Sequence, residues 1–290
     1  MAIDRIDEMY DKLRRAKELK LARDLIQLYR EARIEMLQRF MSMHSGKDAL
    51  AMAAVQQTMD ELERGMLYYT TRAAELRALS VDTVFELGQR ATYDMIRSGE
   101  ELAAAANPSY VPPPLAQLSV SIGFIDRTAV EAAIGNIPRL AGKVTDFVLD
   151  RIRTELARGI VLGESIPKLA KRMLGTGLTQ EGLKRPFSSV HARAVTIART
   201  ETSKAMDAGH QSMLERSKVY LPDLESQWIT ADDERVDPPC PKYARGGRLG
   251  KGIYPIDSGP RPIINTHPNC RCRRIPYRAA WYVEGGEKRA

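Results

Sequence analysis

The stretch VQQTMDELERGMLYYTTRAAEL, residues 55–76, decides the fold of the N-terminal part of this chain. Its apolar side chains recur at alternating intervals of four and three residues: Val55, Met59, Leu62, Met66, Tyr69, Ala73 and Leu76. This spacing is typical of an α-helix that packs one apolar stripe against a second helix. The stretch therefore predicts a long helix with one buried face.

A similar stripe lies upstream and consists of Ile3, Ile6, Tyr10, Leu13, Leu21, Leu25, Leu28, Ala32, Met36 and Phe40. Residues 1–106 contain no proline, and Gly46 in the polar break HSGKD suits the end of a helix. We expect an antiparallel helical hairpin, followed by a third helix from about residue 82 to 105. The stripes are expected to form an intramolecular core, with docking against other protein subunits as the alternative.

The proline-rich stretch NPSYVPPPL, residues 107–115, ends this helical region because proline removes backbone donors. Helices are expected next at 126–135, 141–158, 165–174 and from Ser188 onward, and then strands at SQWIT, RRIPY and AAWYV. The predicted fold class is α+β and predominantly α. Its expected parts are a helical hairpin or arm (1–106), a Pro-rich linker (107–115), a helical domain (116–225) and a basic, irregular, β-rich module (226–290).

The charge of the chain is distributed unevenly. The net charge is +7, and residues 235–290 hold 12 Lys and Arg against 4 Asp and Glu. This concentration favours an anionic partner, with nucleic acid as the first candidate and a solvated basic tail as the alternative. The chain begins with an acidic, amphipathic stretch and lacks any long apolar run, so we expect synthesis in the cytosol and no membrane segment.

The stretch NTHPNCRCRRIPY, residues 265–277, brings His267, Cys270 and Cys272 into one short segment, and Cys240 lies upstream after RVDPP. One histidine and three thiolates form a ligand set that Zn²⁺ accepts in closed tetrahedral sites. Asp237 stands where a C-x-x-C pair would have its first cysteine and is a further candidate ligand. A bound Zn²⁺ would stabilise a module that has few apolar side chains.

Two other interpretations of this cluster stay open. The thiols could be buried in a metal-free turn, or a cysteine could act as a nucleophile with His267 as its base. The chain has no G-x-S-x-G, H-E-x-x-H, P-loop or dinucleotide motif. The sequence therefore favours a protein without a catalytic site.

Three blocks of the sequence resemble a known family. RAVTIARTETSKAMDAG (193–209), WITADDERVDPPC (228–240) and HPNCRCRRIPY (267–277) are similar, in order and spacing, to the blocks of the phage Mu F-like head morphogenesis proteins. Many members of that family carry C-x-x-C after the R-V pair, where this chain has Asp237. The resemblance implies a minor capsid protein of a tailed phage, made in the host cytoplasm and built into the virion at low copy number near the portal.

The resemblance also implies partners: the portal or major capsid protein, and in some members the packaged double-stranded DNA, with which the protein is ejected. At the junction between helix and module we expect Glu201 to pair with Arg235, and Arg199 with Asp232, beside Thr200 and Trp228. A phosphate-contacting face for DNA is expected from the basic side chains of the module, which are Arg245, Arg248, Lys251, Arg271, Arg273, Arg274 and Arg278.

Two alternatives to a DNA-binding head protein follow from the same residues. One is an enzyme carried in the phage head, either a metal-dependent nuclease that uses His267 and Cys270 or a transferase that uses Arg199 and Glu201. The other is a scaffold protein whose basic face is covered by the portal.

Overall fold

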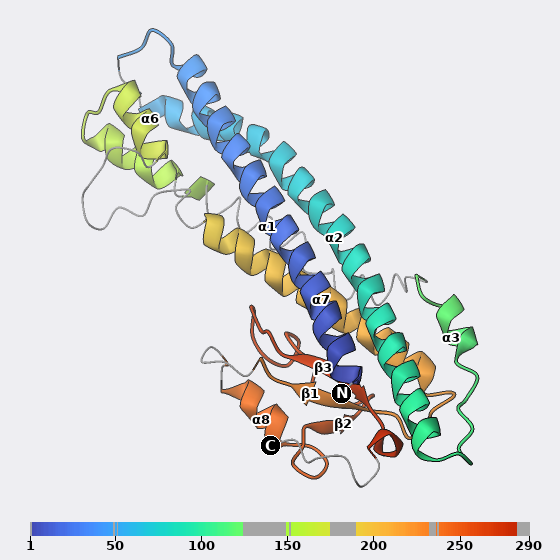
Figure 1. Cartoon of the computed structure of the whole chain (residues 1–290). Coiled ribbons are helices and arrows are strands. Elements are labelled where there is room, and N and C mark those ends of the chain that lie inside the picture. The colour runs from blue at the N-terminus through green and yellow to red at the C-terminus, as the bar shows by residue number, and fades with distance from the viewer. Residues whose placement is uncertain are drawn as a thin grey trace. The chain divides into compact units, whose positions relative to one another are not determined.

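The computed structural model describes residues 2–123, 149–174, 190–231 and 236–282, apart from the single positions 49, 51, 151 and 237 (Figure 1). The architecture is α+β and predominantly α, as predicted. Long helices make up most of it, and a small antiparallel sheet lies near the C-terminus. Among the described residues, no helix combines the length and the apolar character needed to cross a membrane.

The N-terminal region consists of two very long helices, α1 (Ala2–Met43) and α2 (Val55–Ala106). The expected turn lies between them: Gly46 has φ +75°, which glycine adopts without strain, and a short 3₁₀ helix, η1 (Met52–Ala54), leads into α2. The expectation of a separate third helix from residue 82 is wrong. No proline interrupts residues 55–106, so α2 continues to Ala106.

The chain folds into two compact units, each assembled from segments that are distant in the sequence. Unit 1 comprises Met1–Glu18, Leu79–Gly135 and Arg199–Ala290, and unit 2 comprises Leu19–Ala78 and Asn136–Ala198. The long helices α1, α2 and α7 (Val190–Ser217) each contribute residues to both units. The division into four consecutive parts stays a prediction.

The core of unit 2 lies between the two predicted stripes. From Leu21 to Phe40 on α1 and from Met59 to Ala73 on α2, the stripe residues are buried and pack together. The helical residues 152–161 and helix α6 (Ile166–Leu174) add Ile152, Leu156 and other apolar side chains to the same cluster. The α6 bounds agree with the expected helix at 165–174, whereas the expected helix at 126–135 lies outside the described residues.

Unit 1 contains the sheet, with strand order β2-β1-β3. The central strand β1 (Glu225–Ile229) pairs antiparallel with β2 (Ile253–Pro255) and with β3 (Arg273–Tyr277). Strands β1 and β3 match the predictions from SQWIT and RRIPY. The expectation of a third strand at AAWYV is wrong, because residues Ala279–Trp281 form a 3₁₀ helix, η2. This turn packs Trp281 against Gly99, and the indole N–H of Trp281 donates to Glu100 at 2.8 Å.

The first turns of α1 turn polar side chains inward. Asp7, Arg14 and Glu18 are buried, whereas Leu13, expected in the apolar stripe, is 45% exposed. The buried groups have partners in unit 1, since Arg14 donates to Ser203 at 3.2 Å and to Glu18 at 3.0 Å. Satisfied ion pairs thus replace apolar packing on this part of the helix.

Helices α2 and α7 approach each other closely in unit 1. A Cβ atom on Gly88 would lie 2.3 Å from the carbonyl oxygen of Met206, and one on Gly209 would lie 2.1 Å from the carbonyl oxygen of Phe85. Only glycine permits such an approach of two backbones. The small residues Ala198, Thr202 and Ala205 of α7 are buried as well.

Candidate metal centre

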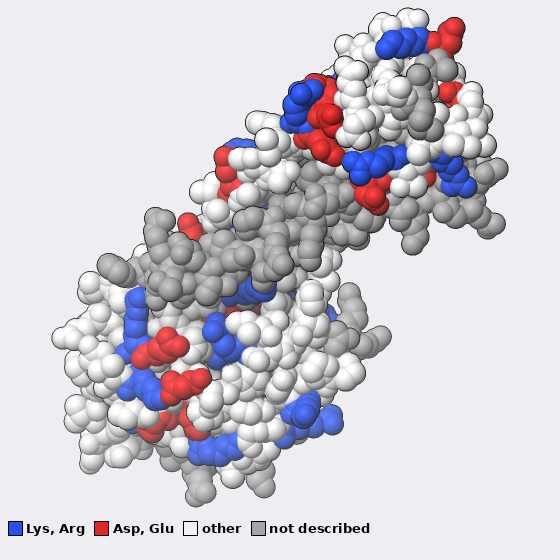
Figure 2. All heavy atoms as spheres, turned by 180° about the vertical axis from the view of Figure 1, so that it is seen from behind, with Lys and Arg blue, Asp and Glu red and all other residues white. Residues whose placement is uncertain are grey.

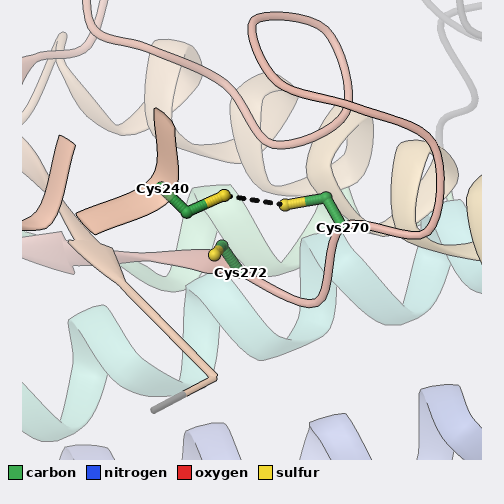
Figure 3. Close-up of side chains that lie close together, drawn as sticks. All are labelled: Cys240, Cys270 and Cys272. Atoms are coloured by element: carbon green, nitrogen blue, oxygen red, sulfur yellow. Dashed lines mark hydrogen bonds between the residues drawn. The ribbon is translucent and has the colours of Figure 1, made fainter. Parts of the chain in front are cut away.

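Three cysteines meet in the interior of unit 1. Cys240 lies in helix α8 (Pro239–Arg245), and Cys270 and Cys272 lie just before β3. Figure 3 shows the sulfur atoms of Cys240 and Cys270 facing each other, with the Cys272 side chain beside them. All three Sγ atoms lie within 4.8 Å of one another, the Cys240–Cys270 distance is 3.6 Å, and all three side chains are buried.

A tight turn delivers His267 and Cys270 to the cluster. The amide of Cys270 donates to the carbonyl oxygen of His267 at 3.3 Å, and Asn269 has φ +66°. Proline in the second position of a turn and asparagine with positive φ in the third are the sequence signature of a type II turn. The residues H-P-N-C therefore fold the chain back on itself and bring the histidine near the thiols.

His267 presents a defined nitrogen to the thiols. Its Nδ1 lies 2.9 Å from the carbonyl oxygen of Pro268, and a carbonyl only accepts, so Nδ1 carries the proton. Its Nε2 lies 3.5 Å from Sγ of Cys240 and is left with its lone pair. Metal-binding histidines commonly hold one ring nitrogen to a backbone carbonyl in this way and coordinate through the other.

Two of these distances agree with a tetrahedral metal ion, whereas the group whose ligand atoms all lie within 4.8 Å of one another consists of the three cysteines, without His267. With metal–sulfur bonds of about 2.3 Å and metal–nitrogen bonds of about 2.0 Å, a tetrahedral ion separates two sulfurs by about 3.8 Å and a sulfur from a nitrogen by about 3.5 Å. The corresponding distances here are 3.6 Å for Cys240–Cys270 and 3.5 Å for Cys240–His267. The buried cluster could therefore hold a metal ion.

The thiols of the cluster share protons strongly. A hydrogen bond from Cys272 lowers the pKa of Cys270 to about 5. Cys272 donates this hydrogen bond to Cys270 and is buried, and both effects raise the pKa of Cys272 far above its ordinary value. A thiolate thus forms readily at Cys270, and a metal cation would displace the remaining thiol protons.

A small aromatic and apolar cluster encloses the thiols. Trp228 and Ile263 are buried with the three cysteines, and Tyr243 packs partly against them. The rings of Trp228 and Tyr243 lie 5.1 Å apart. The tryptophan of the second sequence block thus packs on the cysteines of the second and third blocks.

The first sequence block also contacts the turn. The amide of Asn269 donates to the hydroxyl of Thr200 on α7 at 3.2 Å. Arg199 pairs with Glu18 of α1 at 2.9 Å, and Glu201 is buried. The expected pairs of Arg199 with Asp232 and of Glu201 with Arg235 involve residues outside the described part of the chain, as does the candidate ligand Asp237.

The arginines expected to contact DNA divide into two groups. Arg274 is 2% exposed and pairs with Asp207 at 2.7 Å, so the expectation that it contacts phosphate is wrong for this fold. Arg273 pairs with Asp7 at 2.6 Å, and Arg278 pairs with Glu100 and Asp223 at 2.8 and 2.7 Å. These three side chains fasten β3 and the residue after it to the helices and to the segment before β1.

The remaining expected cations lie nearer to the surface. Arg245, Arg248 and Lys251 are exposed, and Arg271 is half-buried. On the face seen in Figure 2, blue and red side chains are interspersed among the coloured residues, without a broad field of one sign. Because Arg273, Arg274 and Arg278 are paired with carboxylates of the protein, the expected basic face is smaller than the sequence suggested.

The carboxylates that hold these arginines were not identified from the sequence. Asp207 is buried and binds both Arg274 and Arg261, and the pKa of its carboxyl is lowered: burial acts to raise it, but these two guanidinium groups together act more strongly. Asp7 lies 266 residues from Arg273 in the chain. No local pattern marks such pairs, because only the folded chain brings the partners together.

The comparison with known proteins agrees with the resemblance seen in the sequence. Residues 150–275 match the family model described as phage Mu protein F like protein. This range includes the first two sequence blocks, the turn and the three cysteines. No curated protein and no solved structure matches the chain. Over residues 150–275, which is less than half of its length, this chain is similar to the phage Mu F-like proteins, a family that suggests a role in phage head morphogenesis.

Proposed function

We propose that this chain is a non-enzymatic minor head protein of a tailed phage, bound at the portal or on the inner surface of the head. The family match over residues 150–275 carries the proposal. The contacts between the sequence blocks support it, because Thr200, Trp228 and the cysteine turn together build a structural core. In this proposal the protein is made in the host cytoplasm and enters the head during assembly, where it also contacts packaged DNA.

The cluster holds one structural Zn²⁺ ion in this proposal, with Cys240, Cys270, Cys272 and His267 as ligands. Three thiolates and one imidazole suit the softness of Zn²⁺, and four protein ligands leave no open position for a substrate. The metal would tie α8 to the turn before β3, inside the small apolar cluster of the module. Asp237 is not needed to complete this ligand set.

An enzyme is less well supported by the geometry. A cavity lined by Asp7, Ser203, His210 and Cys272, among others, lies beside the cluster in unit 1, but its volume is ≈ 20 Å³. Such a volume admits about one water molecule. The transferase alternative relies on Arg199 and Glu201. The Arg199 side chain is paired with Glu18, and the Glu201 side chain is buried.

Thermal melting with and without a chelator tests the role of the metal. The wild-type chain should lose stability when the metal is removed, and Cys270→Ser should be less stable and insensitive to the chelator. Ile275→Val is the matched control, since it removes one buried methylene from the same module at a cost of about 1 kcal/mol and leaves the ligands intact. A wild-type melting curve that the chelator leaves unchanged contradicts the zinc proposal.

Analysis of purified heads tests the assignment to the head. The wild-type chain should be present in heads at a few copies, and loss of the protein should give defective heads. Cys270→Ser should reduce incorporation in proportion to its loss of folded protein. A chain that is absent from complete, infectious heads rules out the proposed function.

A further inference from the structure

The connection between α8 and β2 carries a cluster of exposed cations. We call Lys242, Arg245, Arg248, Leu249 and Lys251 the basic loop. The first two residues lie in the last turn of α8, and the others lie in the glycine-rich segment that follows. All five side chains are exposed, and four of them are positively charged.

The backbone of the basic loop is held in a fixed shape. The amide of Gly252 donates to the carbonyl of Gly246 at 2.9 Å, and the amide of Arg248 donates to the carbonyl of Ile253 at 2.8 Å. The amide of Trp228, next to the thiol cluster, donates to the carbonyl of Gly252 at 2.8 Å. The loop is therefore built onto the sheet, and little conformational entropy is lost when it binds a partner.

Leu249 is unusual in both backbone and exposure. Its φ is +60°, a left-handed conformation that a leucine adopts only at a cost, and its side chain is 73% exposed. Glycine would fit the same backbone without that cost, as it does at Gly247 and Gly250. Packing inside this chain does not explain the leucine, so a contact with a partner is the better explanation.

The charge of the basic loop is largely free. Among the described residues, Lys242, Arg245 and Lys251 have no ion-pair partner, while Arg248 pairs with Glu225 and lies over the ring of Tyr277 at 5.6 Å. By contrast, carboxylates of the protein neutralise Arg273, Arg274 and Arg278. Among the described residues of the module, the cations without an ion-pair partner are thus concentrated at this loop.

We infer that the basic loop binds the sugar–phosphate backbone of duplex DNA, with Leu249 packed against the sugars at the edge of a groove. The inference rests on the proposed function, because the interior of a phage head is filled with duplex DNA. Long, flexible cations contact phosphates without reading bases, so the binding is independent of sequence. Four cations on one loop predict a modest affinity that falls with salt.

Fluorescence anisotropy with a mixed-sequence DNA duplex tests the inference on the full chain. The logarithm of the wild-type binding constant should fall with the logarithm of salt concentration with a slope of about −3.5, which corresponds to four phosphates. The triple variant Lys242→Ala, Arg245→Ala, Lys251→Ala should bring the slope to about −1. The control Lys12→Ala, Lys17→Ala, Lys171→Ala removes the same charge from exposed positions elsewhere and should leave the slope unchanged.

A second variant separates the apolar contact from the charge. Leu249→Ser should weaken binding severalfold while the salt slope stays that of the wild type, since no counterion release is lost. Equal losses in the loop and control triple variants overturn the inference, as does wild-type binding that is indifferent to salt. Loss of head incorporation in the loop triple variant, with DNA binding retained, points instead to an acidic protein partner and also overturns it.

The experiments test the proposed function and the DNA contact of the basic loop separately. A wild-type chain that is found in heads but binds DNA independently of the loop refutes only the inference about the loop. A wild-type chain that is absent from heads refutes the proposed function, whatever the DNA measurements give.

Discussion

Arg274 shows that the partner of a single residue determines whether its charge is neutralised in the core or available to a ligand. Its guanidinium is buried and shares the carboxylate of Asp207 with Arg261. Taking such ions out of water is costly, and the cost is offset only while both partners are present. The sequence around Arg274 resembles a basic DNA-binding segment, and only the distant Asp207 makes it part of the core.

Replacement of Asp207 tests this interpretation. Asp207→Asn leaves Arg274 without its counter-charge and should reduce the free energy of unfolding by about 3–5 kcal/mol in urea titrations. Asp223→Asn is the control, because the Asp223 side chain is 56% exposed where it pairs with Arg278, and its loss should cost less than about 1 kcal/mol. Equal effects of the two variants contradict the account of a buried ion pair.

His210 makes the stability of unit 1 depend on pH. Burial lowers the pKa of its imidazole to about 4. The charge of Asp207 acts in the opposite direction, more weakly, and the charges of Arg274 and Arg273 lower the pKa a little further. Thr92 donates its hydroxyl to the carbonyl of Gly88 at 3.0 Å and therefore accepts from Nδ1–H of His210. The folded protein thus holds this histidine in its neutral form at pH 7.

The sign of the pH effect follows from proton binding. Between pH 6.5 and about 4 the unfolded chain protonates His210 and the folded chain does not, so stability falls as the pH falls through this window, by about 3 kcal/mol in total. His210→Gln should flatten this part of the stability curve. An NMR titration of the wild-type ring checks the cause directly, and a midpoint near 6.5 in the folded protein contradicts it.

At the scale of elements, the contact of α2 with α7 depends on two glycines. Gly88→Ala should destabilise the protein even though alanine favours helices, because its Cβ would lie 2.3 Å from a backbone oxygen. Gly65→Ala on α2 is the control, since its nearest neighbour is the flexible end of the Met36 side chain, which can move. Calorimetry should show a lower melting temperature for Gly88→Ala only, and the account fails if both variants behave alike.

The helical elements could be predicted because their signals are local. The heptad spacing on α1 and α2 correctly marked the core of unit 2 from Leu21 to Phe40 and from Met59 to Ala73. The same pattern failed at Leu13, where buried polar partners from α7 and β3 occupy the inner face of α1. The strand prediction failed at AAWYV, where Trp281 packs on Gly99 in a 3₁₀ turn.

At the scale of the whole molecule, unit 1 joins the start of the chain to residues near its end. Asp7 and Arg273 form an ion pair across 266 residues, and Arg278 reaches Glu100 across 178. The meeting of the three cysteines could be predicted from residue types, and the H-P-N-C turn from its local signature, whereas metal binding by the cluster stays a prediction. The partners of the arginines could not, because pairing over such separations leaves no pattern in the sequence.

The cysteine cluster and His267 link α8 to the turn before β3 in the C-terminal module of unit 1. In the proposed function, a terminal module with few apolar side chains would keep its shape because Cys240, Cys270, Cys272 and His267 would bind a metal ion. The fixed base of the basic loop depends on the same cluster, since α8 contains Cys240 and leads directly into the loop. Both the fold of the module and its proposed DNA contact therefore rest on this site.

The most direct test is the molar ratio of zinc to chain in full-length protein purified without chelator, measured by elemental analysis. The account predicts one zinc ion per chain, and a ratio near zero for Cys270→Ser. A folded, fully reduced wild-type chain that contains less than about a tenth of an equivalent of any transition metal would contradict it.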